Sequence, residues 1–273
     1  MAESIQIRVL ERAIDILDVL KHHAGNVSLS TISRETSIAK TTVFRILQTL
    51  CSRGYVRQEP GTNHYVLGYK LLELSFSAAT QWEFISLAQP YLDRLRDELN
   101  ETTALAIKSG IYYAFIARAL CRNEYRVTPV MGERYYLHWA GTGKAILAYA
   151  SAEEVEAILA LLPSTAVTGH TLRDPAELNE QLTDIRQTGC ASSFSERIEG
   201  GASYSTAILD KKQKPVAAIS VVGPEIRLKK MDRALVCEKL QNAARALETA
   251  YRLAGVDLEA AENYWRATDD KTA

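Results

Sequence analysis

Cysteine is scarce in this chain, and no spacing of cysteine or histidine matches a metal-binding pattern. The 273 residues contain four widely separated cysteines, at Cys51, Cys121, Cys190 and Cys237. They form no Cys-x-x-Cys pair, so we expect reduced thiols instead of a disulfide framework or a zinc site. The five histidines also lack His-Glu-x-x-His spacing. The sequence therefore predicts neither a metal site nor a cofactor.

Long apolar runs are missing as well. No segment approaches the roughly 20 apolar residues that a helix needs to cross a bilayer. The first residues also lack the basic and apolar regions of a signal peptide. We expect a cytoplasmic protein without a membrane partner. The length and the 47% hydrophobic content are sufficient for two domains, each with its own core.

Two segments approach catalytic motifs without completing them. Residues 141–145 read Gly-Thr-Gly-Lys-Ala, but a phosphate-binding loop needs glycine where His138 stands and serine or threonine where Ala145 stands. Residues 201–205 approach a nucleophile elbow but end in Ser205 instead of glycine. The carboxylates show no close pairing for acid–base chemistry. No catalytic residue is assigned, and an enzyme is the weaker alternative.

Most of the information lies in residues 26–69. Two short helical patterns precede two short strand patterns that flank turn-forming residues. This order is typical of a winged helix-turn-helix, whose second helix enters the major groove of DNA. The predicted elements are a helix at 29–36 capped by Ser28, a turn at 37–39, a helix at 40–52 ended by Gly54, and strands at 55–57 and 65–67 around a turn at 59–63.

The second of these helices has an apolar face for packing and a polar face for DNA. The apolar face carries Val43, Ile46, Leu47 and Leu50, and the polar face carries Lys40, Thr41, Thr42, Arg45, Gln48 and Thr49. Residues 26–58 hold five basic residues and one acidic residue, a local net charge of +4 in a chain whose total is −1. A winged helix that contacts only protein is the alternative. The predicted DNA contacts are Ser30, Lys40, Thr41, Thr42, Arg45 and Arg57.

Three segments carry a family resemblance: ERAIDIL at residues 11–17, LSTISRETSIAKTTVFRILQTLCSRGYV at 29–56, and YVLGYKLLELS at 65–75. They resemble IclR-type transcriptional regulators, and the resemblance extends to about Gly255. It implies an α+β chain with a winged helix-turn-helix DNA-binding domain and a GAF-like α/β effector-binding domain. The implied ranges are 1–68 for the first domain, 69–81 for a linker helix, 82–255 for the second domain and 256–273 for a polar tail.

The second half of the sequence alternates strand and helix patterns, as expected for an α/β domain with a mostly antiparallel sheet. Amphipathic helices at 70–81 and 82–99 lead into it, and Pro90 is expected to kink the second one or to reset its first turn. Strands are expected at 104–108, 112–117, 125–130, 136–140, 191–195, 204–209 and 216–222, and helices at about 143–150, 152–162, 175–188 and 231–253.

The segment Gly141-Thr142-Gly143 is predicted as a loop that enters a helix. Backbone amides at such a position bind carboxylates, and glycine lets a ligand approach the backbone closely. The family resemblance places this loop, the strand around Ser203 and the last strand in the effector pocket. The residues carried over are Gly141, Thr142, Ser203, Ser220 and Val222, with Met131 and Leu137 as apolar walls.

Residues 194–201 depart from the family pattern, in which an acidic run precedes the glycine and a cysteine often follows. This run is shortened and includes Arg197, and Ser203 stands at the expected cysteine position. Arg197 either pairs with an acidic effector or is a solvated loop charge. The effector therefore cannot be transferred from a relative, and the supply of tyrosine and tryptophan leaves both a sugar acid and an aromatic acid open.

Together these features predict a homodimeric or homotetrameric regulator, most simply a repressor of catabolic genes. Its partners are a double-stranded DNA operator and a small organic acid, which shifts the equilibrium between arrangements of the DNA-binding domains. The apolar excess of residues 9–17 and 70–81 suits a dimer contact, although packing within one chain explains it equally well. A small-molecule enzyme with a GAF-like core and a protein-binding scaffold are the alternatives.

Overall fold

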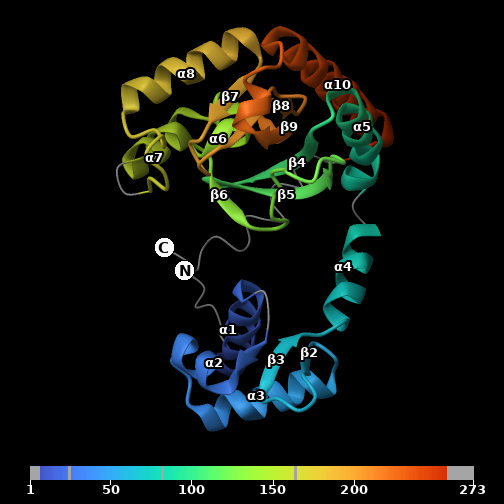
Figure 1. Ribbon diagram of the computed structural model, residues 1–273, viewed down its shortest axis with the longest axis vertical. Coiled ribbons are helices and arrows are strands. Elements are labelled where there is room, and N and C mark those ends of the chain that lie inside the picture. Colours follow the sequence, from blue (N-terminus) through green and yellow to red (C-terminus); the bar gives the residue numbers. More distant parts are fainter. Residues whose placement is uncertain (1–6, 24–25, 81–82, 163–164, 257–273) are drawn as a thin grey trace. The chain divides into compact units, whose positions relative to one another are not determined.

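The computed structural model describes residues 7–23, 26–80, 83–162 and 165–256 of the chain (Figure 1). The chain divides into two compact units, residues 1–82 and 83–273. Among the described helices, none is both long and apolar enough to cross a bilayer. The predicted tail at 256–273 lies outside the described residues, apart from its first residue.

The N-terminal unit is a small helical core with a three-stranded antiparallel sheet. The strands lie in the order β1-β3-β2, and Val56 of β2 pairs with Leu67 of β3. Both helices of the predicted helix-turn-helix have the predicted bounds. The elements are α1 (Arg8–His22), β1 (Val27–Ser28), α2 (Leu29–Thr36), α3 (Lys40–Ser52), β2 (Val56–Gln58), β3 (His64–Leu67) and α4 (Lys70–Thr80).

Local chemistry fixes the turn between α2 and α3. The Ser28 hydroxyl accepts a hydrogen bond from the Thr31 amide (3.1 Å), which caps α2 as expected. Ser37 adopts a left-handed conformation (φ 55°) and ends α2. The Ser33 hydroxyl donates to the Ile38 carbonyl (2.6 Å) and thereby closes the turn. These bonds orient α3, whose inner face packs against the core.

The C-terminal unit is a six-stranded antiparallel sheet with helices on both faces. The strand order is β6-β5-β4-β9-β8-β7 in the described residues. Helices α5 and α10 cover one face, and α6, α7 and α8 cover the other (Figure 1). The elements are α5 (Glu83–Leu99), β4 (Thr102–Ser109), β5 (Tyr112–Ala119), β6 (Arg134–Tyr136), α6 (Ala140–Leu147), α7 (Ala152–Leu161), α8 (Pro175–Thr188), β7 (Ala191–Phe194), β8 (Gly201–Leu209), β9 (Pro215–Pro224), α9 (Glu225–Leu228) and α10 (Arg233–Ala254).

Three expectations for this unit are wrong. The strand expected at 136–140 shares only Tyr136 with the observed strand, because β6 spans Arg134–Tyr136. Residues 125–130 form no strand, because this stretch pairs with no neighbouring strand, and the Arg118 guanidinium holds the Pro129 carbonyl instead. Helix α6 begins at Ala140, about three residues earlier than predicted. The glycines of the predicted loop therefore lie in the first turn of α6. A sequence pattern cannot reveal these facts, since they depend on which segments meet in space.

The cysteines also differ from the expectation of reduced thiols. Cys190 and Cys237 form a disulfide with a Cα–Cα distance of 5.7 Å, although 47 positions separate them in the chain. Cys51 and Cys121 are free. The disulfide connects the start of β7 to α10, and both of its cysteines are buried in the core cluster between the sheet and α10. Sequence spacing could not predict this pair, because the fold alone brings β7 beside α10.

Candidate DNA interface and effector cavity

Helix α3 presents a continuous polar face to solvent. Val43, Ile46 and Leu47 are buried in the core, and Thr42 is half-buried. The exposed residues are Lys40, Thr41, Phe44, Arg45, Gln48 and Thr49. Phe44 is not among the contacts predicted from the sequence, and its aromatic side chain is 47% exposed among these polar groups. An exposed aromatic on a recognition face can contact the methyl group of thymine, so its apolar character was the signal to follow.

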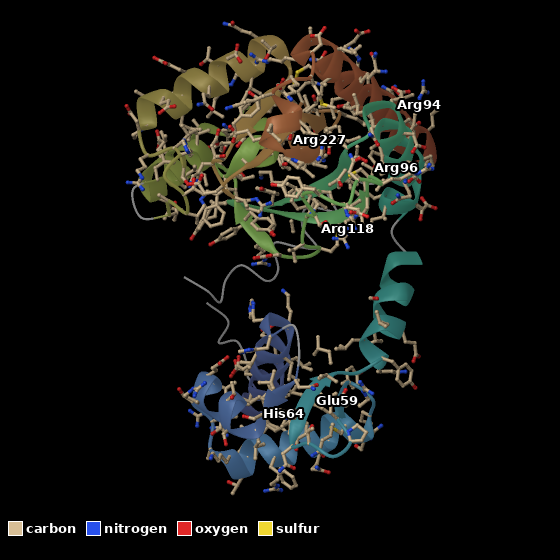
Figure 2. The ribbon with its side chains drawn as sticks, in the orientation of Figure 1. Glu59, His64, Arg94, Arg96, Arg118 and Arg227 are labelled. Atoms are coloured by element: carbon tan, nitrogen blue, oxygen red, sulfur yellow. A yellow bond between two sulfur atoms is a disulfide. The ribbon has the colours of Figure 1, made fainter. Side chains whose placement is uncertain are left out.

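The basic residues of this unit differ in how far their charge is neutralised. Within the described part of the chain, Lys40, Arg45 and Arg53 have no ion-pair partner. Arg57 is paired with Glu59 at the base of the wing turn, opposite His64 (Figure 2). Because Glu59 lies just beyond the predicted basic stretch, that stretch overstates the charge available at the wing. Ser30 is exposed on α2.

A small cavity of about 30 Å³ lies in the C-terminal unit, beside the start of α6. Of the predicted pocket residues, Thr142, Ser203 and Val222 line it, whereas Gly141, Ser220, Met131 and Leu137 do not. The volume corresponds to about one water molecule, so a ligand of several heavy atoms requires side chains to move. The lining residues are Tyr113, Phe115, Val127, Ala140, Thr142, Ser193, Arg197, Ile198, Gly201, Ala202, Ser203 and Val222.

The glycines of α6 allow the protein's own backbone and side chains to approach closely. The Gly141 amide donates to the Ser203 hydroxyl (3.1 Å), and a Cβ at Gly141 would lie 2.9 Å from that oxygen. A Cβ at Gly143 would lie 2.3 Å from the Leu137 carbonyl oxygen. Both glycines are thus explained by packing. The cavity is lined at this point by Ala140, which has a left-handed conformation (φ 61°).

Ser220 belongs to a buried cluster of hydroxyl groups. Its oxygen lies 2.9 Å from the Thr142 hydroxyl and 2.8 Å from the Ser205 hydroxyl, and Ser220 is fully buried. Thr142 alone of the three also lines the cavity. A buried hydroxyl must be hydrogen-bonded, and here the cluster satisfies itself. Ser220, on β9, therefore helps to orient the Thr142 side chain through this hydrogen bond.

Arg197 lies in the cavity wall and is half-buried. Its guanidinium carbon lies 4.6 Å from the centre of the Tyr135 ring, within the range of a cation–π contact. Burial raises the pKa of Tyr113 and of Tyr135, and the nearby Arg197 charge opposes both shifts. The placement of Arg197 could not be predicted from the sequence, and Ser193, which lies in the same wall, was not among the predicted residues.

A buried ion pair anchors the loop that carries Arg197. The Lys144 ammonium, fully buried in α6, donates to Glu196 (2.6 Å) and to Gln181 (2.7 Å). Burial lowers the pKa of Lys144 and raises the pKa of Glu196, and the charge of each partner opposes the shift of the other. The hydroxyls of Thr168 and Thr171 donate to the Glu196 carbonyl (2.9 and 2.6 Å). The backbone next to Arg197 is therefore held firmly.

His138, two residues before α6, predicts a pH dependence of stability. It is fully buried and its Nδ1 has no hydrogen-bond partner, so desolvation lowers its pKa from 6.5 to about 4. The unfolded chain thus binds a proton that the folded chain rejects, and stability present above pH 6.5 is lost as pH falls toward 4. Between about pH 7.5 and about pH 5 this amounts to about 2 kcal/mol. Urea unfolding at the two pH values measures it.

The variant His138→Phe is the control for this prediction. It removes the titrating group and keeps an aromatic ring among Tyr136 and Trp139. Its free energy of unfolding should fall less between the two pH values than that of the parent, by the same amount of about 2 kcal/mol. Equal losses in parent and variant would show that His138 does not titrate differently on folding.

Comparison with known families identifies both units. Residues 9–60 match the IclR helix-turn-helix domain, and residues 76–249 match the bacterial transcriptional regulator IclR C-terminal domain. The chain belongs to the IclR family of bacterial transcriptional regulators. It is a DNA-binding regulator, and its relatives are regulators, not enzymes. The predicted family and fold class are confirmed.

Named relatives and solved structures cover nearly the whole chain. The regulator BhcR of Paracoccus denitrificans is 32% identical over 88% of this chain and 86% of its own. The repressor AllR of Escherichia coli is 30% identical over 90% of this chain and 91% of its own. A transcriptional regulator of Rhodococcus sp. RHA1 superposes with a TM-score of 0.80 at 25% identity, over 92% of this chain and all of its own.

Another solved structure is an IclR homologue of Microbacterium hydrocarbonoxydans in complex with 4-hydroxybenzoate. It superposes on this chain with a TM-score of 0.79 at 22% identity, covering 90% of this chain and 99% of its own. At this identity the likeness concerns the fold alone.

Proposed function

We propose that this IclR-family regulator is a repressor that binds a pseudo-palindromic operator as a dimer and responds to a small organic acid. The observation that carries the DNA part is the exposed polar face of α3, on which Lys40 and Arg45 have no ion-pair partner in the described residues. A helix of this kind fits the major groove, and free cations near its start attract phosphate or base edges. The relatives AllR of E. coli and IclR of E. coli are named repressors, which favours repression.

A second copy of the chain is the proposed occupant of the apolar surface of the N-terminal unit. Val9, Leu10 and Ile14 of α1 are each 58–61% exposed, and Leu72 of α4 is 61% exposed. Two recognition helices on neighbouring half-sites require such a pairing, because half-sites lie about 34 Å apart on one face of DNA. Contacts from both subunits also raise affinity without enlarging either binding face.

The effector would bind beside the start of α6. Thr142, Ser193 and Ser203 supply hydroxyl groups to the cavity, and Tyr113, Phe115 and Val222 supply apolar wall. A carboxylate that leaves water needs hydrogen bonds to replace its solvation, and hydroxyl groups at a helix start provide them. The complex of an IclR homologue with 4-hydroxybenzoate supports an acid of this size. In its present form the cavity must widen to accept one.

Substitution on α3 tests the DNA part of the proposal. Arg45→Ala is expected to weaken operator binding by about 10-fold or more, because each subunit loses one charged contact to DNA. Thr42→Ala should weaken it by less, since Thr42 is half-buried and uncharged. Band-shift titration with the promoter of the protein's own gene measures both effects.

Arg94→Ala is the matched control. Arg94 is an exposed arginine on α5 of the other unit (Figure 2), and its side chain is 80% exposed. This variant should bind the operator like the parent. If Arg45→Ala and Thr42→Ala also bound like the parent, α3 would not be the recognition helix.

A further inference from the structure

We propose that the effector carries two anionic groups and that Arg197 binds the second of them, so that Arg197 sets a preference for dicarboxylic over monocarboxylic acids. This inference rests on the proposed function, because it concerns the cavity in which we place the effector. It adds the chemical class of the ligand and a specificity-determining residue.

The cavity wall has polar groups from two different elements. Ser203 lies on β8 and meets the first turn of α6 through its bond to the Gly141 amide. Arg197 lies on the loop between β7 and β8, and its guanidinium lies over Tyr135 of β6. Apolar wall, Phe115 and Val222, lies on β5 and β9, which stand between β6 and β8 in the strand order. A ligand with an anionic group at each end and carbon between them matches this arrangement.

The charge of Arg197 is not committed to any acid of the described chain. Glu196, its neighbour, is paired with Lys144 (2.6 Å). Glu133 accepts a hydrogen bond from the Tyr135 hydroxyl (2.7 Å) and makes no ion pair with Arg197. The guanidinium of Arg197 makes a cation–π contact with the Tyr135 ring instead. A cation–π contact is weaker than a bidentate hydrogen-bonded pair with a carboxylate, so an anion in the cavity would compete for Arg197 successfully.

Hydrogen bonds fix the backbone of the loop at residues 195–200, whereas the Arg197 side chain is able to move. Thr168 and Thr171 bind the Glu196 carbonyl, and the Gly200 amide donates to the Ser195 hydroxyl (2.9 Å). The arginine side chain itself is anchored only by the face of Tyr135 in the described structure. Since about 30 Å³ of space is too small for an acid, entry requires side chains of the wall to move, and Arg197 is the charged one among them. A diacid can pair with Arg197 while its other carboxylate binds the hydroxyl groups beside α6, whereas a monoacid bound at those hydroxyl groups has no second anion for Arg197.

Calorimetry on the full chain with matched acids tests the inference. The probes are malate against lactate, and isophthalate against benzoate, so that each pair differs by one carboxylate. The parent should prefer the diacid of at least one pair by about 10-fold or more. Arg197→Met should remove that preference and leave affinity for the monoacid within about 2-fold, while Arg197→Lys should retain part of it. Arg173→Met, an exposed arginine outside the cavity lining, should bind like the parent.

The possible failures of this inference and of the proposed function can be told apart. If acids bind the parent and Ser203→Ala lowers the affinity for them, the cavity is the effector site. In that case, an unchanged diacid preference in Arg197→Met would overturn the role of Arg197 alone. A parent that preferred the monoacid in both pairs would overturn the dicarboxylate class. If no acid of either pair bound the parent, both the inference and the proposed cavity would be wrong.

Discussion

Replacing Lys144 by methionine is expected to lower the free energy of unfolding by about 3–5 kcal/mol. The substitution leaves Glu196 buried without its cation, and one of its oxygens already has no hydrogen-bond partner. Charging an isolated carboxylate in this environment is costly, so the variant must either protonate Glu196 or open the loop around it. Urea unfolding followed by circular dichroism measures the loss.

Two further variants separate this effect from ordinary loss of packing. Lys144→Met combined with Glu196→Gln removes both charges and should recover part of the lost stability, because no unpaired charge is left behind. Arg94→Met breaks an exposed pair with Glu98, whose atoms are 2.8 Å apart, and should cost far less stability, because solvent screens this pair. A single variant at Lys144 that was as mild as the one at Arg94 would contradict the importance of the buried pair.

The helix-turn-helix was predictable because its signals are local. Ser28 caps α2 and Gly54 (φ 76°) follows α3, so a few neighbouring residues fix the ends of each helix. The hairpin of β4 and β5 was predictable for the same reason, since Gly110 (φ 55°) lies in the turn that follows Ser109. The missing strand at 125–130 shows the limit. Its residues have strand propensity, but a strand also needs a partner, and that partner is not a property of the segment itself.

The cavity was predictable only in part, because its walls come from segments that are far apart in sequence. Of the residues proposed for the effector pocket, Thr142, Ser203 and Val222 line the cavity, whereas Ser220 is covered by Thr142 and Ser205. Ser220 and Val222 lie on the same face of β9, so the difference between them depends on where α6 places Thr142, and the sequence does not show that. The disulfide between β7 and α10 depended in the same way on tertiary packing. No local pattern placed Arg197 over Tyr135, because β6 and the loop after β7 meet only in the folded unit.

Raising the salt concentration from about 50 to about 200 mM is expected to weaken operator binding roughly 10³-fold. The reason is counterion release, since each cation that contacts a phosphate frees an ion from the DNA. Lys40, Arg45 and Arg53 have no ion-pair partner among the described residues, so a dimer brings about six such cations to the operator. Arg57 is left out of this number because Glu59 already pairs with it. Fluorescence anisotropy with an operator fragment at several salt concentrations gives the slope.

The slope also distinguishes which cations reach the DNA. Arg45→Ala removes one contact from each subunit of a dimer, so the magnitude of the logarithmic slope should fall by about two. Arg57→Ala should change it by less, because its charge is already offset, and Arg94→Ala should leave it unchanged. Affinity that stayed constant over this range of salt would show that phosphate contacts do not hold the protein on DNA. If the Arg45→Ala dimer kept the full salt dependence of the parent, the Arg45 side chain would lie away from the duplex. The proposed orientation of α3 in the groove would then be wrong.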